Sequence, residues 1–379
     1  MVSIKKIVLV VIIYFMSFIL LREAVTTYME WQPTRLFIPH NKFNHITTPN
    51  FPHEKIIGRD KNIKSIKINS QGIREDEDVI LPKPGGVYRI LMVGDSFIFG
   101  GDKPDMPDQL EKTLNEFLGT KKLKFDVLNC GVPSYSPMLH LARLKHQYLS
   151  FDPDAIIYFP DLTDVYDDTH RYKWLAKFDD AGKLVSVIGS TRILRAKRRH
   201  KRQVNYLLKM LGLREPKLRD VRSQDKSQYP HIFDHAMEAG PNISSHTLEE
   251  IEFTLSFIKS FIKTSRREHI FLSILMYPHL PQIISANQAY STNFASLYNR
   301  LFEKKVQEMA WKEGVSFKSF FKSVKKRVLA GENLYEENDM HFNENGFQFL
   351  GSEIARWVIQ NPETAIGFFP ANSDRSQKN

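Results

Sequence analysis

From Tyr88 onward, short runs rich in β-branched and aromatic residues alternate with longer amphipathic stretches. Five such runs predict strands at 88–93, 125–129, 155–159, 269–275 and 315–317. Apolar residues at steps of three and four predict helices at 109–118, 137–151, 247–266, 293–313 and 344–359. This alternation indicates parallel strands joined by crossover helices. The pattern therefore predicts an α/β fold, a three-layer α/β/α sandwich around a doubly wound parallel sheet of about five strands.

Two segments interrupt the alternation. Residues 30–84 form an extended lead-in, and residues 170–245 form a long insertion between the third and fourth predicted strands. The predicted domain is thus split into residues 85–169 and 246–360, followed by a polar tail at 361–379.

The N-terminal residues 1–29 carry an export pattern. Lys5 and Lys6 precede an apolar run at 7–21, which is shorter than the about 20 residues of a full bilayer span. No small-x-small cleavage site follows, which favours a retained anchor over a cleaved signal. Positive residues before the run favour a cytoplasmic N-terminus. We therefore expect one membrane segment, with the catalytic domain on the periplasmic or extracellular side.

The positive charge of the chain is concentrated in the insertion. The formal net charge is +10, and residues 187–230 alone hold thirteen Lys or Arg against three acids. The rest of the chain is therefore close to neutral. Contact of the 192–226 segment with anionic lipid or an acidic polysaccharide is one interpretation, and a solvated basic helix packed on its own domain is the other. Nucleic acid is not expected, because the segment is exported and its aromatics, Tyr206 and Tyr229, are isolated.

A candidate nucleophile lies at the end of the first predicted strand. Residues 90–93 run directly into Gly94-Asp95-Ser96, which puts the serine at the carboxyl edge of the sheet and at the start of a helix. Ligands bind at that edge, and free N–H groups at a helix start can stabilise an oxyanion. Serine needs a base to become a nucleophile. Alone, the tripeptide equally fits a turn followed by an N-cap serine.

A candidate base lies near the other end of the chain. His341 stands in a predicted loop before the last helix, two residues after Asp339. A carboxylate at that spacing can turn back to hold the imidazole Nδ1–H. By itself His341 equally fits a loop histidine that caps the helix. The occurrence of both motifs in one chain favours catalysis.

These motifs resemble those of the SGNH/GDSL hydrolase family, in the same order. The first block is 94–96, the second 127–133, the third runs from 153–159 into 162–164, and the last is Asp339-x-His341. The resemblance covers about 66–168 and 335–356. It includes a lead-in at 69–74 similar to that of membrane-anchored bacterial members, and it leaves the basic insertion unexplained.

The resemblance implies roles for individual residues. Ser96 would be the nucleophile, His341 the general base and Asp339 the acid that orients it. The oxyanion hole would consist of the N–H groups of Ser96 and Gly131, with Thr163 as a third donor. Asp95 and Asp164 would support these groups.

Two departures from the family pattern affect the expected activity. Thr163 stands where the family usually has asparagine, so a side-chain amide is missing from the oxyanion hole. Loss of one such donor costs about 10²–10³ in rate, so slower or altered catalysis is expected. Many members also place the acid three residues before the histidine, where this chain has Asn338. Asp339 instead fits an Asp-x-His variant shared with polysaccharide acetyltransferase-like members.

The expected function is that of a serine-dependent esterase or O-acyltransferase. An acyl-Ser96 intermediate would pass its acyl group to water or to a sugar hydroxyl, with acylated cell-envelope or exported glycans or small esters as substrates. The alternative is a catalytically weakened glycan-binding or assembly subunit that keeps the fold. The sequence has no Cys/His cluster, Walker loop or dinucleotide fingerprint, so neither a cofactor nor a metal is expected.

Overall fold

The computed structural model of the chain describes ten segments. They are residues 13–14, 16–18, 20–21, 36–51, 54–57, 63–101, 104–189, 245–283, 294–336 and 340–369. Most of the expected anchor, the 192–226 basic segment and Asp339 lie outside them. Among the described residues, no helix combines the length and apolar character needed to cross a membrane.

Five parallel strands form the central sheet. They are β5 (Val87–Val93), β6 (Lys124–Asn129), β7 (Ala155–Tyr158), β10 (Phe271–Met276) and β11 (Ser316–Ser319), in the order β11-β10-β7-β5-β6. Each matches a predicted strand within a few residues, and the predicted fold class is confirmed. The chain passes from β5 to β6 on one side and then to β7 on the other. The strand order therefore reverses between β5 and β7, the position where open α/β sheets bind their ligands.

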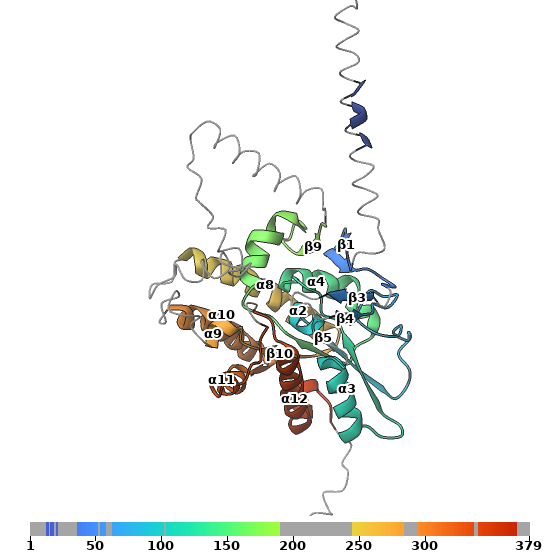
Figure 1. Ribbon diagram of the computed structural model, residues 1–379, viewed down its shortest axis with the longest axis vertical. Helices are drawn as coiled ribbons and strands as arrows, with labels where there is room; N and C mark the ends of the chain where they lie inside the picture. Colours follow the sequence, from blue (N-terminus) through green and yellow to red (C-terminus); the bar gives the residue numbers. More distant parts are fainter. Residues whose placement is uncertain are drawn as a thin grey trace, which may run out of the picture.

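Helices cover both faces of this sheet (Figure 1). One layer contains α3 (Met106–Phe117), α11 (Phe321–Leu329), α12 (Glu344–Gln360) and α13 (Pro362–Ile366), and the other contains α4 (Pro137–His146), α8 (Ser245–Arg267) and α10 (Phe294–Lys312). Successive side chains of β5 divide between the layers: Ile90 and Met92 join the first core, Leu91 and Val93 the second. Strands buried on both faces explain why the predicted strands are continuously apolar.

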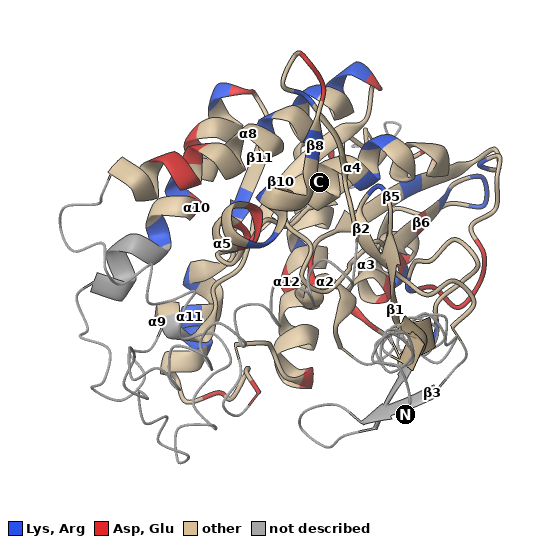
Figure 2. Ribbon diagram, turned by 90° about the horizontal axis from the view of Figure 1, so that it is seen from above, with Lys and Arg blue, Asp and Glu red and all other residues tan. Residues whose placement is uncertain are grey.

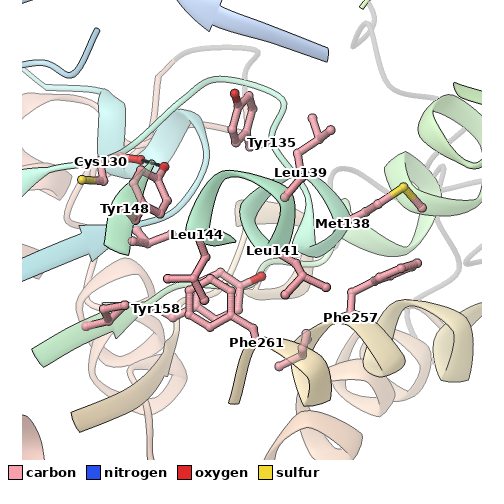
Figure 3. Close-up of a cluster of buried hydrophobic side chains, with 14 of the residues drawn as sticks. Cys130, Tyr135, Met138, Leu139, Leu141, Leu144, Tyr148, Tyr158, Phe257 and Phe261 are labelled. Carbon is pink, nitrogen blue, oxygen red and sulfur yellow. Dashed lines mark hydrogen bonds between the residues drawn. The ribbon is translucent and has the colours of Figure 1, made fainter. Parts of the chain in front are cut away.

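The core between α4 and α8 holds the second layer to the sheet (Figure 3). Leu141 and Leu144 of α4 and Phe257 and Phe261 of α8 are all buried there. Phe261 stacks on Tyr158 of β7 with 4.8 Å between the ring centroids. Burial of each such apolar side chain contributes about 1.5–3 kcal/mol. Tyr158 immediately precedes one of the loops of the candidate site, so this packing fixes where that loop begins.

The two segments that interrupt the predicted alternation contain short hairpins. The lead-in holds β1 (Phe37–His40) with β2 (Asn44–Thr47) and β3 (Glu54–Ile57) with β4 (Ile63–Ile66), and the insertion contains β8 (Ala176–Phe178) and β9 (Leu184–Val187) after two short helical turns. The β8–β9 hairpin packs on the domain, because Val187 N donates to Lys42 O at 2.7 Å and Lys145 Nζ donates to Leu184 O at 2.9 Å. Such hairpins are too short to give a clear period in the sequence.

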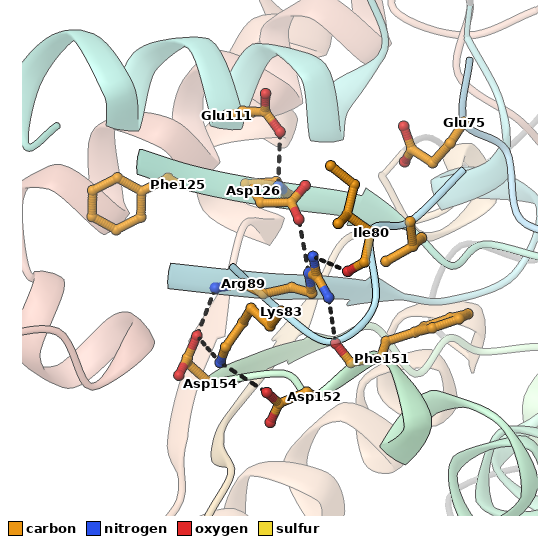
Figure 4. A network of polar contacts seen from close by, with 12 residues as sticks. Glu75, Ile80, Lys83, Arg89, Glu111, Phe125, Asp126, Phe151, Asp152 and Asp154 are labelled. Carbon is orange, nitrogen blue, oxygen red and sulfur yellow. Dashed lines mark hydrogen bonds and ion pairs between the residues drawn. The ribbon is translucent and has the colours of Figure 1, made fainter. Parts of the chain in front are cut away.

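Buried Arg89 anchors the start of β5 (Figure 4). Its guanidinium group bonds Asp126 Oδ2 at 2.7 Å, Phe151 O at 2.7 Å and Ile80 O at 3.2 Å. Its backbone N–H donates to Asp154 Oδ2 at 2.7 Å. One side chain thus ties the lead-in, β6 and the segment before β7 to the strand that ends in Gly94-Asp95-Ser96.

Charged residues of both signs are spread over the described part of the chain. In the view of Figure 2, Lys and Arg residues lie on several separate helices and loops, with Asp and Glu residues among them. This distribution agrees with the sequence count, in which the net charge comes from the insertion.

Candidate active site

The chain turns sharply from β5 into the short helix α2 (Ser96–Phe99). Asp95 is the N-cap of α2, and its Oδ1 accepts the Phe97 N–H at 2.9 Å. A Cβ on Gly94 would lie 2.5 Å from Ile98 Cγ1 and 3.2 Å from Phe159 Cβ, so this turn requires glycine. Ser96 is partly exposed, whereas the next three residues are buried. The turn therefore presents the serine hydroxyl at the carboxyl edge of the sheet.

The structure brings Ser96 and His341 together. Ser96 Oγ lies 2.8 Å from His341 Nε2, and the His341 ring stacks on Phe97 with 5.0 Å between centroids. If the ring proton is on Nδ1, Nε2 accepts the serine proton; this tautomer is the one that a general base requires. The two predicted residues thus have the geometry of a nucleophile and its base.

A closed loop carries His341. Glu336 N donates to His341 O at 2.9 Å, and Tyr335 pairs with Phe342 in an isolated antiparallel bridge. After this loop, Asn343 caps α12 by accepting the Gly346 N–H at 3.0 Å. The bridge and the cap fix both ends of the segment that contains Asp339. Asp339 itself lies outside the described residues, so its role stays a prediction.

Asp95 competes for the same serine proton. Its Oδ2 lies 3.1 Å from Ser96 Oγ, and its Oδ1 also accepts the Tyr277 hydroxyl at 3.1 Å. Burial and, secondarily, the charge of Asp161 raise the pKa of Asp95 to about 7. A protonated Asp95 can donate to Ser96 Oγ, which leaves the serine proton for His341. An ionised Asp95 can only accept and would draw the proton away.

Gly131 is placed next to the nucleophile helix, as the second block implies. A Cβ at this position would lie 2.3 Å from Phe99 N and 2.7 Å from Ile98 C, so the loop packs directly on the backbone of α2. The Gly131 N–H donates to Asn129 Oδ1 at 3.0 Å. In this arrangement that N–H is engaged within the loop.

Thr163 lies in the loop after β7, which is next to β5 in the sheet. Its backbone N–H and its hydroxyl both donate to Asp161 Oδ1, each at 2.7 Å. Asp164 supports the same loop by accepting the Asp161 N–H at 2.9 Å. Both donor groups of Thr163, the predicted third oxyanion donor, are thus bonded to Asp161 in this structure.

Sequence reasoning missed a buried pair behind the nucleophile. His279 Nε2 lies 3.3 Å from Asp161 Oδ2, and the side chains are 0% and 1% exposed. Burial raises the pKa of Asp161, but the contact with His279 and the two bonds from Thr163 outweigh it and lower that pKa overall. A signal was available, because His279 closely follows a predicted strand and so belongs to the same sheet edge as Ser96.

The segment from Tyr277 to His279 touches three loops of the site. Tyr277 Oη donates to Asp95 in the nucleophile turn, and His279 faces Asp161 in the Thr163 loop. The Pro278 carbonyl accepts the Tyr335 hydroxyl at 2.6 Å, at the base of the His341 loop. The end of β10 therefore fixes the loops relative to one another.

The lead-in also reaches the site through two charged residues. Buried Arg74 donates to the carbonyls of Phe99, Gly100 and Gly101 at the end of α2. Glu75 Oε1 accepts the Asn129 N–H at 2.5 Å. Arg74, the last residue of the 69–74 motif, thus holds the nucleophile helix in place, and Glu75 after it holds the Gly131 loop.

The described residues show no metal-binding arrangement. Nowhere in these segments do three or more His, Cys, Asp or Glu side chains form a group that could hold a metal ion.

Comparison with known proteins returned structural likenesses and no sequence match. No protein-family model and no curated protein matches the chain. The acetyl xylan esterase AlAXEase is 11% identical, with a TM-score of 0.42 over 71% of this chain and 98% of its own. The lipase/acylhydrolase from Enterococcus faecalis is 12% identical, with a TM-score of 0.40 over 76% of this chain and 100% of its own. A two-domain esterase active on acetylated mannans is 13% identical, with a TM-score of 0.41 over 76% and 54%.

All three similar structures are esterases or acylhydrolases. Identities and TM-scores at this level do not transfer an activity to this chain.

Proposed function

We propose that this protein is a serine-dependent ester hydrolase or O-acyltransferase that works through an acyl-Ser96 intermediate. The observation that carries the proposal is the 2.8 Å contact between Ser96 Oγ and His341 Nε2. It occurs at the carboxyl edge of a parallel sheet, beside the point where the strand order reverses. Ser96 and His341 are both partly exposed, so a substrate can approach them.

The proposed reaction has two stages. In the first, Ser96 Oγ attacks the ester carbonyl carbon while its proton moves to His341 Nε2. The tetrahedral intermediate then collapses, the bond to the alcohol oxygen breaks, and His341 returns the proton to the leaving alcohol. In the second stage, His341 takes a proton from water or from an acceptor hydroxyl, which attacks the acyl-serine. Ser96 regains its proton, and an acid or a new ester is released.

Negative charge on the carbonyl oxygen needs hydrogen-bond donors. The backbone N–H of Ser96 lies in the first turn of α2, where helix N–H groups favour an anion. The Gly131 donor joins it when the substrate oxygen replaces Asn129 Oδ1 as its acceptor, whereas Thr163 stays bonded to Asp161 and orders its loop. In this proposal, substrate binding completes the oxyanion hole.

The proposed substrates are acyl esters of exported or cell-envelope glycans. This part rests on the export pattern in residues 1–29, which would place the domain outside the cytoplasmic membrane. Water as the final acceptor gives an esterase, and a sugar hydroxyl gives an O-acyltransferase. Incubation of an acetylated donor ester with glycan acceptors, followed by mass spectrometry, separates the two by the fate of the acetyl group.

Labelling with a fluorophosphonate probe tests the proposed nucleophile. The wild-type protein should be labelled at Ser96 and should hydrolyse 4-nitrophenyl acetate. Ser96→Ala should lose both, and His341→Gln should lower both by at least about 10³-fold. Ser150→Ala changes an exposed serine outside the site and serves as the control, with labelling unchanged. Labelling that persists in Ser96→Ala would exclude Ser96 as the nucleophile.

A second candidate is a glycan-binding or assembly subunit that keeps the fold without turnover. The engagement of the Gly131 N–H with Asn129 and of both Thr163 donors with Asp161 favours it, because no substrate oxygen could use them as they stand. In that case the wild-type protein would bind acylated glycan but would neither react with the probe nor hydrolyse the ester.

A further inference from the structure

The contact of His279 with Asp161 lies directly behind the nucleophile. The His279 ring centroid is 5.0 Å from that of Phe97, the residue after Ser96. Neither partner reaches solvent, since the exposed fractions of the two side chains are 0% and 1%. Substrate therefore cannot contact them, and any effect on the reaction must pass through neighbouring groups.

The two carboxylate oxygens of Asp161 contact different groups. Oδ1 accepts both the N–H and the hydroxyl of Thr163, which fixes the loop after β7. Oδ2 faces Nε2 of His279 at 3.3 Å. Among the described residues, neither ring nitrogen of His279 nor Asp161 Oδ2 makes a hydrogen bond, so the 3.3 Å approach of Nε2 to Oδ2 is a close polar contact without hydrogen-bond geometry. The contact with Asp161 is thus the polar interaction that the structure gives this buried ring.

Among the buried carboxyl groups of Asp95, Asp161 and Asp164, that of Asp161 holds the negative charge. Burial raises the pKa of Asp95 to about 7 and that of Asp164 well above its ordinary range, and in both cases the charge of Asp161 adds to the shift. The pKa of Asp161 itself is lowered, as described above. The charge of Asp161 acts on Asp95, whose Oδ2 lies 3.1 Å from Ser96 Oγ. The negative charge of Asp161 would therefore oppose the charge that forms on the substrate oxygen unless a neighbouring group compensates it.

We propose that His279 and Asp161 form a positioning pair for the ester site. Asp161 holds the Thr163 loop in place, and the ring edge of His279 that faces Asp161 Oδ2 offsets the charge of the carboxylate so that it does not oppose the developing oxyanion. The inference rests on the proposed function, because it concerns the same reaction at Ser96. It assigns His279 an effect on the rate of the chemical step, with little effect on substrate binding.

Two substitutions distinguish compensation of the Asp161 charge by His279 from simple packing of the two side chains. In Asp161→Asn, the amide oxygen can still accept both bonds from Thr163, but the charge is gone. In His279→Gln, a polar side chain remains, but the carboxylate loses the imidazole. The double variant D161N/H279Q has neither the charge nor its compensation.

Steady-state hydrolysis of 4-nitrophenyl acetate by the four proteins tests the pair. H279Q should lower kcat by about 10–100-fold, less than the loss of a direct oxyanion donor, with KM within about twofold of wild type. The double variant should recover kcat to within about fivefold of D161N, because the uncompensated charge has been removed. Equal kcat in H279Q and the double variant, or a kcat of H279Q equal to wild type, would overturn the proposal.

The rate of Ser96 labelling by a fluorophosphonate and the midpoint of thermal unfolding are measured on the same samples. If H279Q does not fold, H279N replaces it. If neither variant folds, the addition of D161N becomes the test: folding restored in the double variant supports the compensation, and folding not restored overturns it. A wild-type protein that neither labels nor hydrolyses the ester would overturn the proposed function and this inference together. Normal labelling of the wild type without the rescue by D161N would overturn this inference alone.

Discussion

Ser96 Oγ and His341 Nε2 lie 2.8 Å apart although 245 residues separate them in the chain. Ser96 begins the helix that follows β5, and His341 ends the loop before α12. Close packing of α12 against α3 brings the loop to the nucleophile: a Cβ on Gly351 would lie 2.5 Å from Gln109 Oε1. The contact therefore depends on the helix layer as well as on the sheet edge.

Ser96 and His341 should act as one unit. Ser96→Ala and His341→Ala are each expected to remove nearly all turnover, because neither residue can activate the substrate alone. The double variant should then be no slower than either single variant within about threefold. Initial rates of ester hydrolysis measure this, and multiplicative losses in the double variant would show that the two residues act independently.

Thr163 should contribute little as a direct donor, because its hydroxyl is used by Asp161. Thr163→Val keeps the backbone N–H bond to Asp161, so kcat should fall by less than about tenfold, against about 10²–10³ for loss of a true oxyanion donor. Thr163→Asn should keep or raise the rate, since an amide can reach further. Thr163→Ser, which retains the hydroxyl, is the control. A loss of 10²-fold or more in the valine variant would identify Thr163 as an oxyanion donor.

Gly131 should tolerate no side chain. The Cβ of Gly131→Ala would meet backbone atoms of α2 at 2.3 Å and 2.7 Å, and backbone cannot rotate away as a side chain can. We expect a loss of about 1–3 kcal/mol in the free energy of unfolding, together with slower labelling of Ser96, because α2 must shift. At Gly85 a Cβ would meet no atom within 4 Å, so Gly85→Ala is the matched control, with a change within about 0.5 kcal/mol. Urea unfolding followed by circular dichroism measures both.

Asp95 should make stability depend on pH. Its folded pKa is about 7 and its ordinary value is 3.8, so the folded protein keeps a proton that the unfolded chain has released between these values. The stabilisation from this proton is complete below about pH 4 and is lost as the pH rises toward 7. Asp95→Asn imitates the protonated form and should therefore gain in melting temperature relative to wild type from pH 5 to pH 8.

The difference between variant and wild type is the quantity to measure. Buried His45 and His140 have pKa values lowered by burial to about 4 and about 3, which weakens the folded state as the pH falls below their ordinary value. These histidines are unchanged in Asp95→Asn and cancel in the comparison. A difference that stays constant across the pH range would show that Asp95 is ionised throughout.

The sequence alone determined the parallel sheet and the two members of the reacting pair, Ser96 and His341. Strands buried on both faces must be continuously apolar, so the five strands could be predicted within a few residues. Gly94-Asp95-Ser96 could be identified because it directly follows a strand with a clear hydrophobic pattern, and His341 because it closely precedes a helix with one. The hairpins β1–β2, β3–β4 and β8–β9 were not predicted. In strands of only three or four residues, the alternation of apolar and polar residues cannot be told from that of a polar loop.

Only the tertiary structure decided which partners these residues have. A hydrogen bond depends on distance and direction in space, and the sequence specifies neither for residues joined through different strands. Gly131 and Thr163 were predicted as oxyanion donors, yet their N–H and O–H groups point to Asn129 and Asp161. His279 gave no motif, because its contact with Asp161 exists only after β10 and β7 have paired in the sheet. The order of the strands thus sets which loops meet, and the loops that meet set the electrostatics around Ser96.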